Sequence, residues 1–245
     1  PIGLLDFVTQ LRELSGGKPV GFKLCIGRKH EFMAICKAML ATGVYPDFIT
    51  VDGAEGGTGA APVEFSNRFG MPCLEGVNFV HNCLTGIGLR DKIKIIASGK
   101  TATGFDIVTK LAVVADVVNA ARTMMLALGC IQSQSCNTNK CPTGIATQNP
   151  RRGRALDVER RHTRVANFQK RTLDSAFDMI GAMGIDDPDK LFPHLIWRRN
   201  ADETSQHFDD VYPDIKNNSL LGDNIPESYA HDWRIASAQT FAPQP

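Results

Sequence analysis

The chain has 245 residues, of which 43% are hydrophobic and 22% charged, and this composition excludes a disordered, collagenous or membrane-embedded protein. Lys and Arg total 27 against 26 Asp and Glu, so the net charge of +1 supplies no general basic field for nucleic acid or acidic lipid. We therefore expect no nucleic-acid partner.

The seven cysteines are too few for a disulfide-rich scaffold and odd in number, which indicates free or metal-bound thiols in a reducing compartment. No apolar run reaches the ~18 residues of a membrane span, and no signal-peptide pattern opens the chain. These features predict a cytoplasmic location.

In chain order, the first segment is residues 1–17, with a leading helix over 4–14. Because the chain opens with Pro1 rather than Met, we expect a piece of a longer protein. Residues 18–129 then alternate short apolar runs with longer segments of helical spacing. The predicted strands are 19–24, 47–52, 92–98 and 113–119, and the predicted helices are 31–42, 74–89, 104–111 and 123–129.

The predicted fold class is α/β. Each predicted strand is almost continuously apolar, as expected of parallel strands covered on both faces. Four βα units in series form either a small open sheet or half of a (β/α)8 barrel of the TIM type, whose usual length is ~250 residues. Periodicity does not separate these two folds.

Three further segments differ in character from the βα units. Residues 130–148 are polar and form a long loop or a ligand-binding insert, and 149–199 are a helical extension with one helix predicted over 154–184. Residues 200–245 are a polar tail that we expect to be extended or poorly ordered unless something holds it.

Three cysteines gather in the polar loop, with five residues between Cys130 and Cys136 and four between Cys136 and Cys141. Iron–sulfur clusters often take their thiolates from one irregular loop that ends in Cys-Pro, and Pro142 follows here. Zinc sites usually show a CxxC pair, which is absent. The alternative is three unrelated thiols, because the other four cysteines follow no pattern.

A glycine-rich loop, residues 52–62, follows the second predicted strand. Glycines let the backbone approach a ligand closely, and the carboxylates of Asp52 and Glu55 could orient a polar substrate. A plain connection between strand and helix is the alternative, although catalytic loops gather at the carboxyl ends of strands.

The third and fourth predicted strands end in the segments 97–104 and 118–122, and each leads into a helix. Consecutive strand ends of this kind form the phosphate cup of the last two units of a βα-barrel. Neither a GxGxxG nor a P-loop motif occurs, which indicates a monophosphate ligand. Ordinary helix capping by Ser and Thr is the alternative.

Two further features are basic. Lys23 lies inside the first predicted strand, where a buried ammonium needs an anionic partner. At a barrel mouth this lysine could stabilise a reduced cofactor. The alternative is that its side chain extends to solvent.

The run 151–171 holds eight Lys or Arg against two acids. It is either a solvated helix face or a surface for an acidic electron donor or for the rest of a larger chain.

With these residues in view, the chain resembles the FMN-binding synthase domain of glutamate synthase and of the shorter proteins of that family, over about residues 21–148. The matching segments, in order, are 22–24, 56–60 with Pro62, 98–99 with Thr103, Gly104 and Asp106, and 127–130 with Cys136 and 141–148. The last segment is the most specific, because it combines cysteine spacing with flanking residues.

The resemblance implies a (β/α)8 barrel, of which this chain holds the C-terminal four βα units, with FMN and a [3Fe-4S] cluster. It implies an oxidoreductase that reduces 2-iminoglutarate, formed from 2-oxoglutarate and ammonia, to L-glutamate. The implied cluster ligands are Cys130, Cys136 and Cys141. The implied catalytic residues are Glu55 and Lys23, and Lys23 also lies by the pyrimidine edge of the flavin.

The resemblance further implies which residues contact FMN and the substrate. The FMN phosphate is held by Ser98, Gly99, Lys100, Ala121 and Arg122. The substrate side is lined by Glu55, Gly56, Gly57 and Thr58, and Gly56 and Gly57 also contact the cofactor.

The chain departs from the usual pattern of glutamate synthase at three places, which leaves the identity of the 2-oxo acid open. Ala54 and Glu55 stand where His-Asp is usual, Lys100 where a second Gly is usual, and Arg122 where Thr is usual. The electron donor is either a ferredoxin or a pyridine-nucleotide subunit. The first four βα units, which would form the other wall of the flavin pocket, are not in this sequence.

Two alternatives stand beside this interpretation. One is a different FMN-dependent (β/α)8 oxidoreductase, which would share the phosphate cup but lack the three-cysteine loop. The other is that the 245 residues alone are an inactive half-barrel, whose open strand edges and apolar inner wall lead to self-association and a homo-oligomer.

Overall fold

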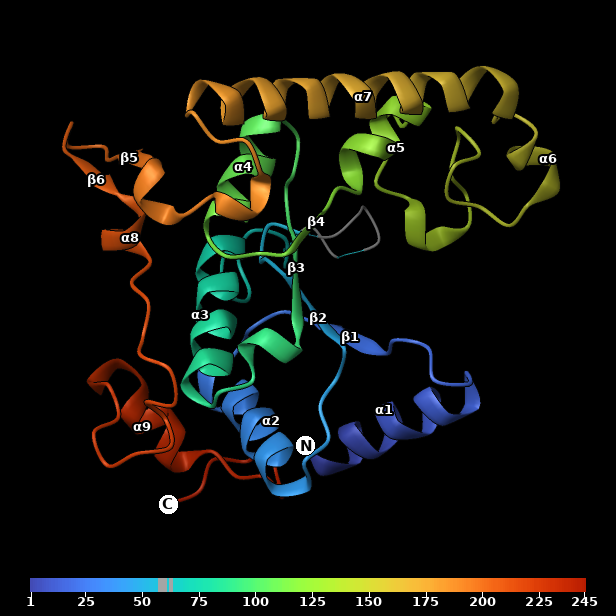
Figure 1. The fold of residues 1–245 in the computed structure, drawn as a ribbon. Coiled ribbons are helices and arrows are strands. Elements are labelled where there is room, and N and C mark those ends of the chain that lie inside the picture. The colour runs from blue at the N-terminus through green and yellow to red at the C-terminus, as the bar shows by residue number, and fades with distance from the viewer. Residues whose placement is uncertain (57–60, 62–63) are drawn as a thin grey trace.

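The computed structural model describes residues 1–56, 61 and 64–245 (Figure 1). Its main sheet has four parallel strands in the order β1-β2-β3-β4. The strands are β1 (Gly21–Leu24), β2 (Phe48–Asp52), β3 (Lys94–Ser98) and β4 (Val117–Asn119), followed in turn by the helices α2 (Lys29–Thr42), α3 (Cys73–Gly86), α4 (Gly104–Ala112) and α5 (Arg122–Leu128). The four predicted βα units are therefore confirmed.

The fourth strand begins four residues later than the sequence pattern predicts. Val113 and Val114 belong to the turn that ends α4, and Val114 has a left-handed backbone with φ 65°. Val113 and Ala115 are nevertheless buried. An apolar run therefore packs into the core as a turn, which hydrophobicity alone does not distinguish from a strand.

Among the described residues, helices cover one face of the sheet, as expected for half of a barrel, whereas the continuously apolar strands indicate cover on both faces in a complete barrel. Ile49, Val51, Ile95 and Ala97 point to the helical side and are fully buried. The opposite face carries the register row Lys23, Thr50, Ile96 and Val117, and Val117 is 46% exposed. Consecutive strand order with helices on one face is the arrangement of a (β/α)8 barrel, of which the chain holds four units.

Helix α1 (Ile2–Leu14) packs against α2 and buries Leu5 and Val8. Arg12 reaches Asp47, just before β2, with Nη2 to Oδ2 at 2.9 Å. The leading helix thus lies across the amino-terminal ends of the strands, away from their carboxyl ends (Figure 1).

Helix α7 (Val158–Ala182) lies along α4 and α5 at the top of Figure 1. Helix α7 begins four residues later than predicted, because Asp157 Oδ1 accepts a hydrogen bond from the Arg160 amide and caps the helix there. The short helix α6 (Pro150–Gly153) precedes it. Gly104 is needed where α4 meets α7, since a Cβ there would lie 2.6 Å from the Ala176 nitrogen.

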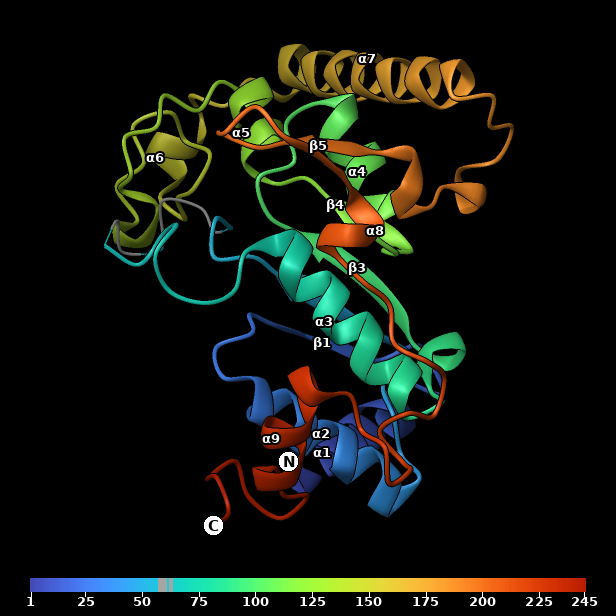
Figure 2. The same cartoon turned by 90° about the vertical axis from the view of Figure 1, so that its left-hand side faces the viewer.

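The polar tail is folded rather than extended. It contains β6 (Ser205–His207), which pairs with β5 (Trp197–Arg199) at the end of the preceding extension, and the helices α8 (Phe208–Val211) and α9 (Glu227–Ile235). Helix α9 packs against α2, and Leu220, Tyr229 and Trp233 join the main core (Figure 2). Short 3-10 turns link other elements: η1 (Arg90–Lys92), η2 (Cys136–Thr138), η3 (Pro188–Lys190) and η4 (Pro193–Leu195).

Hydrogen bonds from α2 and α3 hold this tail. The buried Asn82 Nδ2 lies 2.9 Å from the Pro213 carbonyl and 3.0 Å from the Tyr229 hydroxyl, and its Oδ1 accepts from the Ile215 amide. Lys37 Nζ donates to the Ala236 carbonyl at 2.8 Å and lies over the Trp233 ring. Within the described part of the chain, no helix is both long and apolar enough to cross a membrane.

This packing predicts that Trp233→Ala lowers the free energy of unfolding by about 3 kcal/mol, because a large buried ring is lost from the core. Trp233 is 9% exposed, whereas Trp197 is 59% exposed and serves as the matched control. Trp197→Ala is expected to change stability by less than about 1 kcal/mol. Denaturant unfolding measures both, and equal losses would contradict the tail's place in the core.

Candidate active site

One cavity of about 470 Å³ lies at the carboxyl ends of the four parallel strands. Eight predicted site residues line it: Lys23, Glu55, Gly56, Ser98, Gly99, Lys100, Ala121 and Arg122. Asp52, Thr101, Asn119 and Thr123 also line it. The predicted substrate residues Gly57 and Thr58 lie outside the described residues.

The loop after β3 turns sharply at Gly99 and Lys100. Gly99 has φ 150° and Lys100 has φ 47°. A Cβ on Gly99 would lie 3.1 Å from the Cys73 Cβ and 3.4 Å from the Gly53 nitrogen, so the backbone packs closely against the neighbouring strand end. Glycine satisfies both the backbone conformation and the close packing at this position.

Thr101 joins the two loops on which the phosphate cup was predicted. Its carbonyl accepts a hydrogen bond of 3.0 Å from Thr123 Oγ1, in the first turn of α5. Its own hydroxyl oxygen is buried and has no hydrogen-bond partner among the residues that the structure describes. A buried unpaired hydroxyl is energetically unfavourable, and a ligand oxygen in this cavity would satisfy it.

The N-terminus of α4 is already capped by its own side chains. Asp106 Oδ2 accepts from the amides of Ala102 and Thr103, at 2.9 and 2.8 Å, and Thr103 Oγ1 accepts from the Asp106 amide. Burial alone would raise the pKa of Asp106, but these hydrogen bonds outweigh it and lower the pKa. Ordinary capping thus explains Thr103, and any anion must bind nearer Gly99, Lys100 and α5.

Lys23 finds its anionic partner in Asp52, with Nζ to Oδ2 at 2.7 Å. The Lys23 side chain is 57% exposed, on the uncovered face of the sheet. The second oxygen of Asp52, Oδ1, is buried without a partner, and a Cβ on Gly56 would overlap it. Asp52, which the sequence indicates as a carboxylate that could orient a substrate, therefore lines the cavity as the ion-pair partner of Lys23.

Glu55 occupies a structural position in addition to lining the cavity. Its two carboxylate oxygens lie 3.0 and 3.1 Å from the Cys73 amide, at the first residue of α3. The negative charge lies at the positive end of the helix, where it is stabilising. Glu55 is thus a cap of α3, and its assignment as a catalytic and substrate residue stays a prediction.

The three cysteines lie in a loop with an unusual backbone. Cys130 follows the left-handed Gly129 that ends α5, Cys136 begins η2, and Cys141 is buried. Three residues other than glycine are left-handed within ten positions: Gln132, Gln134 and Asn139. Strained backbone of this kind concentrates at functional sites.

Hydrogen bonds close this loop on itself. The Asn139 Oδ1 accepts from the Gln148 amide at 2.6 Å and from Thr147 Oγ1 at 3.0 Å. Arg152 Nη1 donates to the Lys140 carbonyl at 3.2 Å, which ties the loop to α6. The loop lies beside the N-terminal end of the basic helix α7 (Figure 1).

The surroundings of Cys141 favour its thiolate form. A hydrogen bond from the Thr143 hydroxyl, supported by the Ala146 amide, lowers its pKa to about 7. Among the described residues, the three sulfur atoms do not all lie within 4.8 Å of one another, so they do not form a site for one ion. In a three-iron cluster each thiolate binds a different iron, which suits more widely spaced sulfurs.

Residues 2–186 match the family model described as the conserved region in glutamate synthase, and the chain belongs to this family. The match extends well beyond the segment 21–148 on which the resemblance in sequence rests. It includes the leading helix and α7, and it ends before the β5–β6 hairpin.

Two curated relatives show how much of a longer protein the chain represents. It is 41% identical to the glutamate synthase large subunit-like protein YerD of Bacillus subtilis over 200 residues, which are 81% of this chain and 38% of the relative. It is 36% identical to the archaeal glutamate synthase [NADPH] of Methanocaldococcus jannaschii over 189 residues, 77% of this chain and 36% of the relative. The chain thus spans less than two fifths of either relative.

Among solved structures, a flavocytochrome b2 variant with pyruvate bound aligns with a TM-score of 0.46 and 13% identity. The alignment covers 76% of this chain and 37% of the flavocytochrome chain.

The capping role predicts that Glu55→Ala lowers the free energy of unfolding by about 1 kcal/mol, because the first amide of α3 loses its acceptor. Glu64→Ala, at an exposed position of the same loop, is the control and is expected to have no effect. Denaturant unfolding distinguishes them. An unchanged stability of the Glu55 variant would exclude the cap.

The thiolate environment predicts that Thr143→Ala raises the pKa of Cys141, because the largest stabilising hydrogen bond is removed. The pH at which alkylation of Cys141 is half-maximal should move upward from about 7 in protein stripped of metal. Mass spectrometry reads Cys141 separately from the other cysteines. Ser133→Ala, which removes only a contact to Ser135, is the control; an identical shift there would contradict the assignment.

Proposed function

We propose that this chain is the C-terminal part of a glutamate synthase-type flavoprotein that reduces 2-iminoglutarate, formed from 2-oxoglutarate and ammonia, to L-glutamate. The proposed cofactors are FMN and a [3Fe-4S] cluster, and the proposed location is the cytoplasm. Family membership supports the general class of oxidoreductase. The observation that carries the specific proposal is the cavity, which is lined by eight residues that the resemblance assigns to FMN and substrate.

The fit of FMN rests on the donors and unpaired atoms of this cavity. Lys100 and Arg122 supply positive charge beside the tight Gly99 turn and the first turn of α5. The unpartnered Thr101 Oγ1 offers a further hydrogen bond to a phosphate oxygen. A monophosphate suits this set, because the cationic side chains converge from two neighbouring strand ends.

Lys23 and Asp52 form the polar floor of the cavity at the other side. Bound FMN would supply the hydride-transfer chemistry that the protein side chains lack. Lys23 holds a positive charge where the resemblance puts the pyrimidine edge of the flavin, and the Asp52 carboxylate fixes the position of its ammonium at 2.7 Å. Asp52 Oδ1 remains available to accept a hydrogen bond from a ligand.

Cys130, Cys136 and Cys141 are the proposed ligands of the cluster. The low pKa of Cys141 supports this role, because thiolates rather than thiols bind iron. The cluster would receive electrons from a separate donor, either a ferredoxin or a pyridine-nucleotide subunit. The basic residues beside the loop, among them Arg151 and Arg154, give an acidic donor a complementary surface.

The uncovered face of the sheet supports the proposal that an N-terminal half of the barrel completes the pocket. Both relatives are more than twice as long as their matched segments, which leaves length for four further βα units. Without them Lys23 and Val117 on this face are exposed, and a homo-oligomer is the proposed state of the chain by itself.

The phosphate site predicts a specific effect of Arg122→Ala in the full-length protein. Loss of one charge-assisted contact should weaken FMN binding by about 10- to 100-fold, while riboflavin, which lacks the phosphate, should bind with unchanged affinity. Flavin fluorescence quenching measures both affinities. Arg151→Ala, outside the cavity, is the control; an equal loss for FMN and riboflavin would contradict the phosphate site.

The cluster predicts that Cys136→Ser in the full-length protein lowers bound iron to a small fraction of the unaltered value and leaves bound FMN in place. Iron and flavin are counted on the same purified sample. Cys25→Ser, at an exposed cysteine outside the loop, should keep both. Equal iron content in the two variants would remove the cluster from the proposal.

A further inference from the structure

A second group of ligand-type side chains lies far from the cavity. One ligand atom from each of His194, His207 and Asp209 lies within 4.8 Å of the others. His194 is in η4, His207 ends β6, and Asp209 is in the first turn of α8. All three lie beyond residues 2–186 that match the family model, so the family's chemistry does not explain them.

The hydrogen bonds of His207 leave one ring nitrogen free to bind a ligand. Its Nδ1 lies 2.8 Å from the carbonyl oxygen of His194. A carbonyl only accepts hydrogen bonds, so Nδ1 carries the proton and Nε2 of the neutral ring keeps its lone pair. Histidines that bind metals characteristically donate their other ring N–H to a carbonyl or a carboxylate in this way.

His194 has the corresponding contact with a carboxylate. Its Nδ1 lies 2.9 Å from Asp209 Oδ2. A metal ion would either take the place of the proton between these two atoms or bind the other ring nitrogen of His194. In both arrangements Asp209 is required, as a ligand or as the group that orients the ring.

The local fold holds the two imidazoles side by side before any ion binds. Their rings stack with centroids 3.8 Å apart and an angle of 11° between planes. Trp197, which pairs with His207 across the hairpin, covers the second face of the His207 ring at 3.6 Å. The in-plane lone pairs of parallel rings lie in parallel planes and do not converge. An ion bound by both histidines therefore requires one ring to turn out of the stack.

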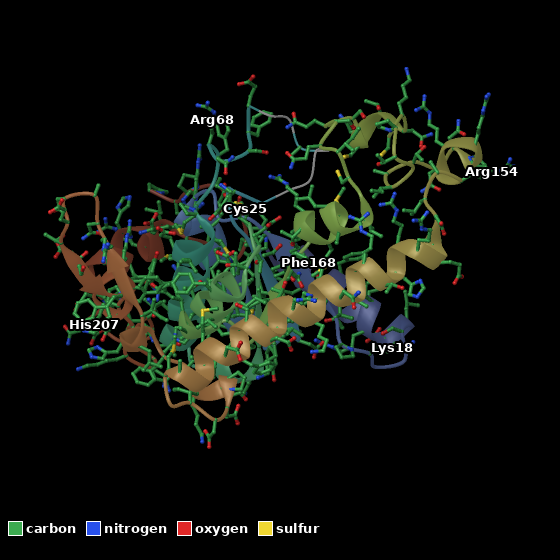
Figure 3. The ribbon with its side chains drawn as sticks, turned by 90° about the horizontal axis from the view of Figure 1, so that it is seen from above. Lys18, Cys25, Arg68, Arg154, Phe168 and His207 are labelled. Atoms are coloured by element: carbon green, nitrogen blue, oxygen red, sulfur yellow. The ribbon has the colours of Figure 1, made fainter. Side chains whose placement is uncertain are left out.

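We propose that His194, His207 and Asp209 form a site for a divalent ion of the zinc class. Two imidazoles with one carboxylate are ligands that such ions accept, and three protein ligands leave a position open for water. The ion would join η4 to the β6–α8 junction. Figure 3 shows His207 at the opposite end of the molecule from Arg154, and therefore far from the cysteine loop beside α6.

Zinc titration of the full chain by calorimetry tests this site. The unaltered protein should bind one more equivalent of Zn²⁺ than His207→Ala, because zinc bound by cysteines is common to both proteins. Asp209→Asn should weaken binding at this site by about 10- to 100-fold. The controls are His162→Ala and Asp210→Asn, which alter an exposed histidine and an exposed aspartate outside the proposed site. Both variants should bind Zn²⁺ as the unaltered protein does.

A second measurement needs no variant and so does not depend on the folding of one. Zn²⁺ should protect His194 and His207, but not the exposed His162, from acylation by diethyl pyrocarbonate, as mapped by mass spectrometry. Equal zinc stoichiometry in the unaltered protein and His207→Ala, or equal acylation of the three histidines with and without Zn²⁺, would overturn the proposal.

Discussion

The parallel register of four neighbouring strands is the constraint on which the site depends. Asp52 pairs with Ser98, and Ser98 with Asn119, so three residues from distant parts of the sequence end in one row. Lys23 pairs with Thr50, two residues before Asp52 on the same face, and its Nζ lies 2.7 Å from Asp52 Oδ2. Because every strand runs in the same direction, all the loops that follow them open at one edge, where the cavity lies.

The same register gives the sheet one apolar face under helices and one face that the described residues leave open. The covered face is a conventional hydrophobic core, which α9 extends with Tyr229 and Trp233. The open face carries the exposed Lys23 and Val117, and Lys23 also lines the cavity. Under the proposed function, a segment outside this chain would supply the second wall of the flavin pocket, and the chain matches less than two fifths of either relative.

The sequence predicts the four βα units correctly because each strand is short and apolar and each helix has clear periodicity. It fails at Val113 and Val114, where the same apolar residues form a turn. It leaves the fold of the tail open, because a few large side chains such as Trp233 provide the packing of a segment that is polar on average. Neither outcome can be derived from local pattern, since both depend on contacts with distant helices.

Prediction from the sequence names Ser98, Gly99 and Ala121 at glycines and strand ends, and these residues line the cavity, while their roles stay predictions. It is incomplete for Glu55, because the carboxylate's contact with the Cys73 amide joins residues 18 positions apart across a loop. The pairing of Lys23 with Asp52 likewise depends on register, which spacing along the chain does not give.

The central claim is that these strand ends form half of a flavin pocket that a preceding half completes. The most direct test is the amount of flavin that stays bound through gel filtration, compared between the 245-residue chain and the full-length protein. The account predicts about one flavin per full-length molecule and almost none on the shorter chain. A monomeric 245-residue chain that retains flavin as fully as the longer protein would contradict it.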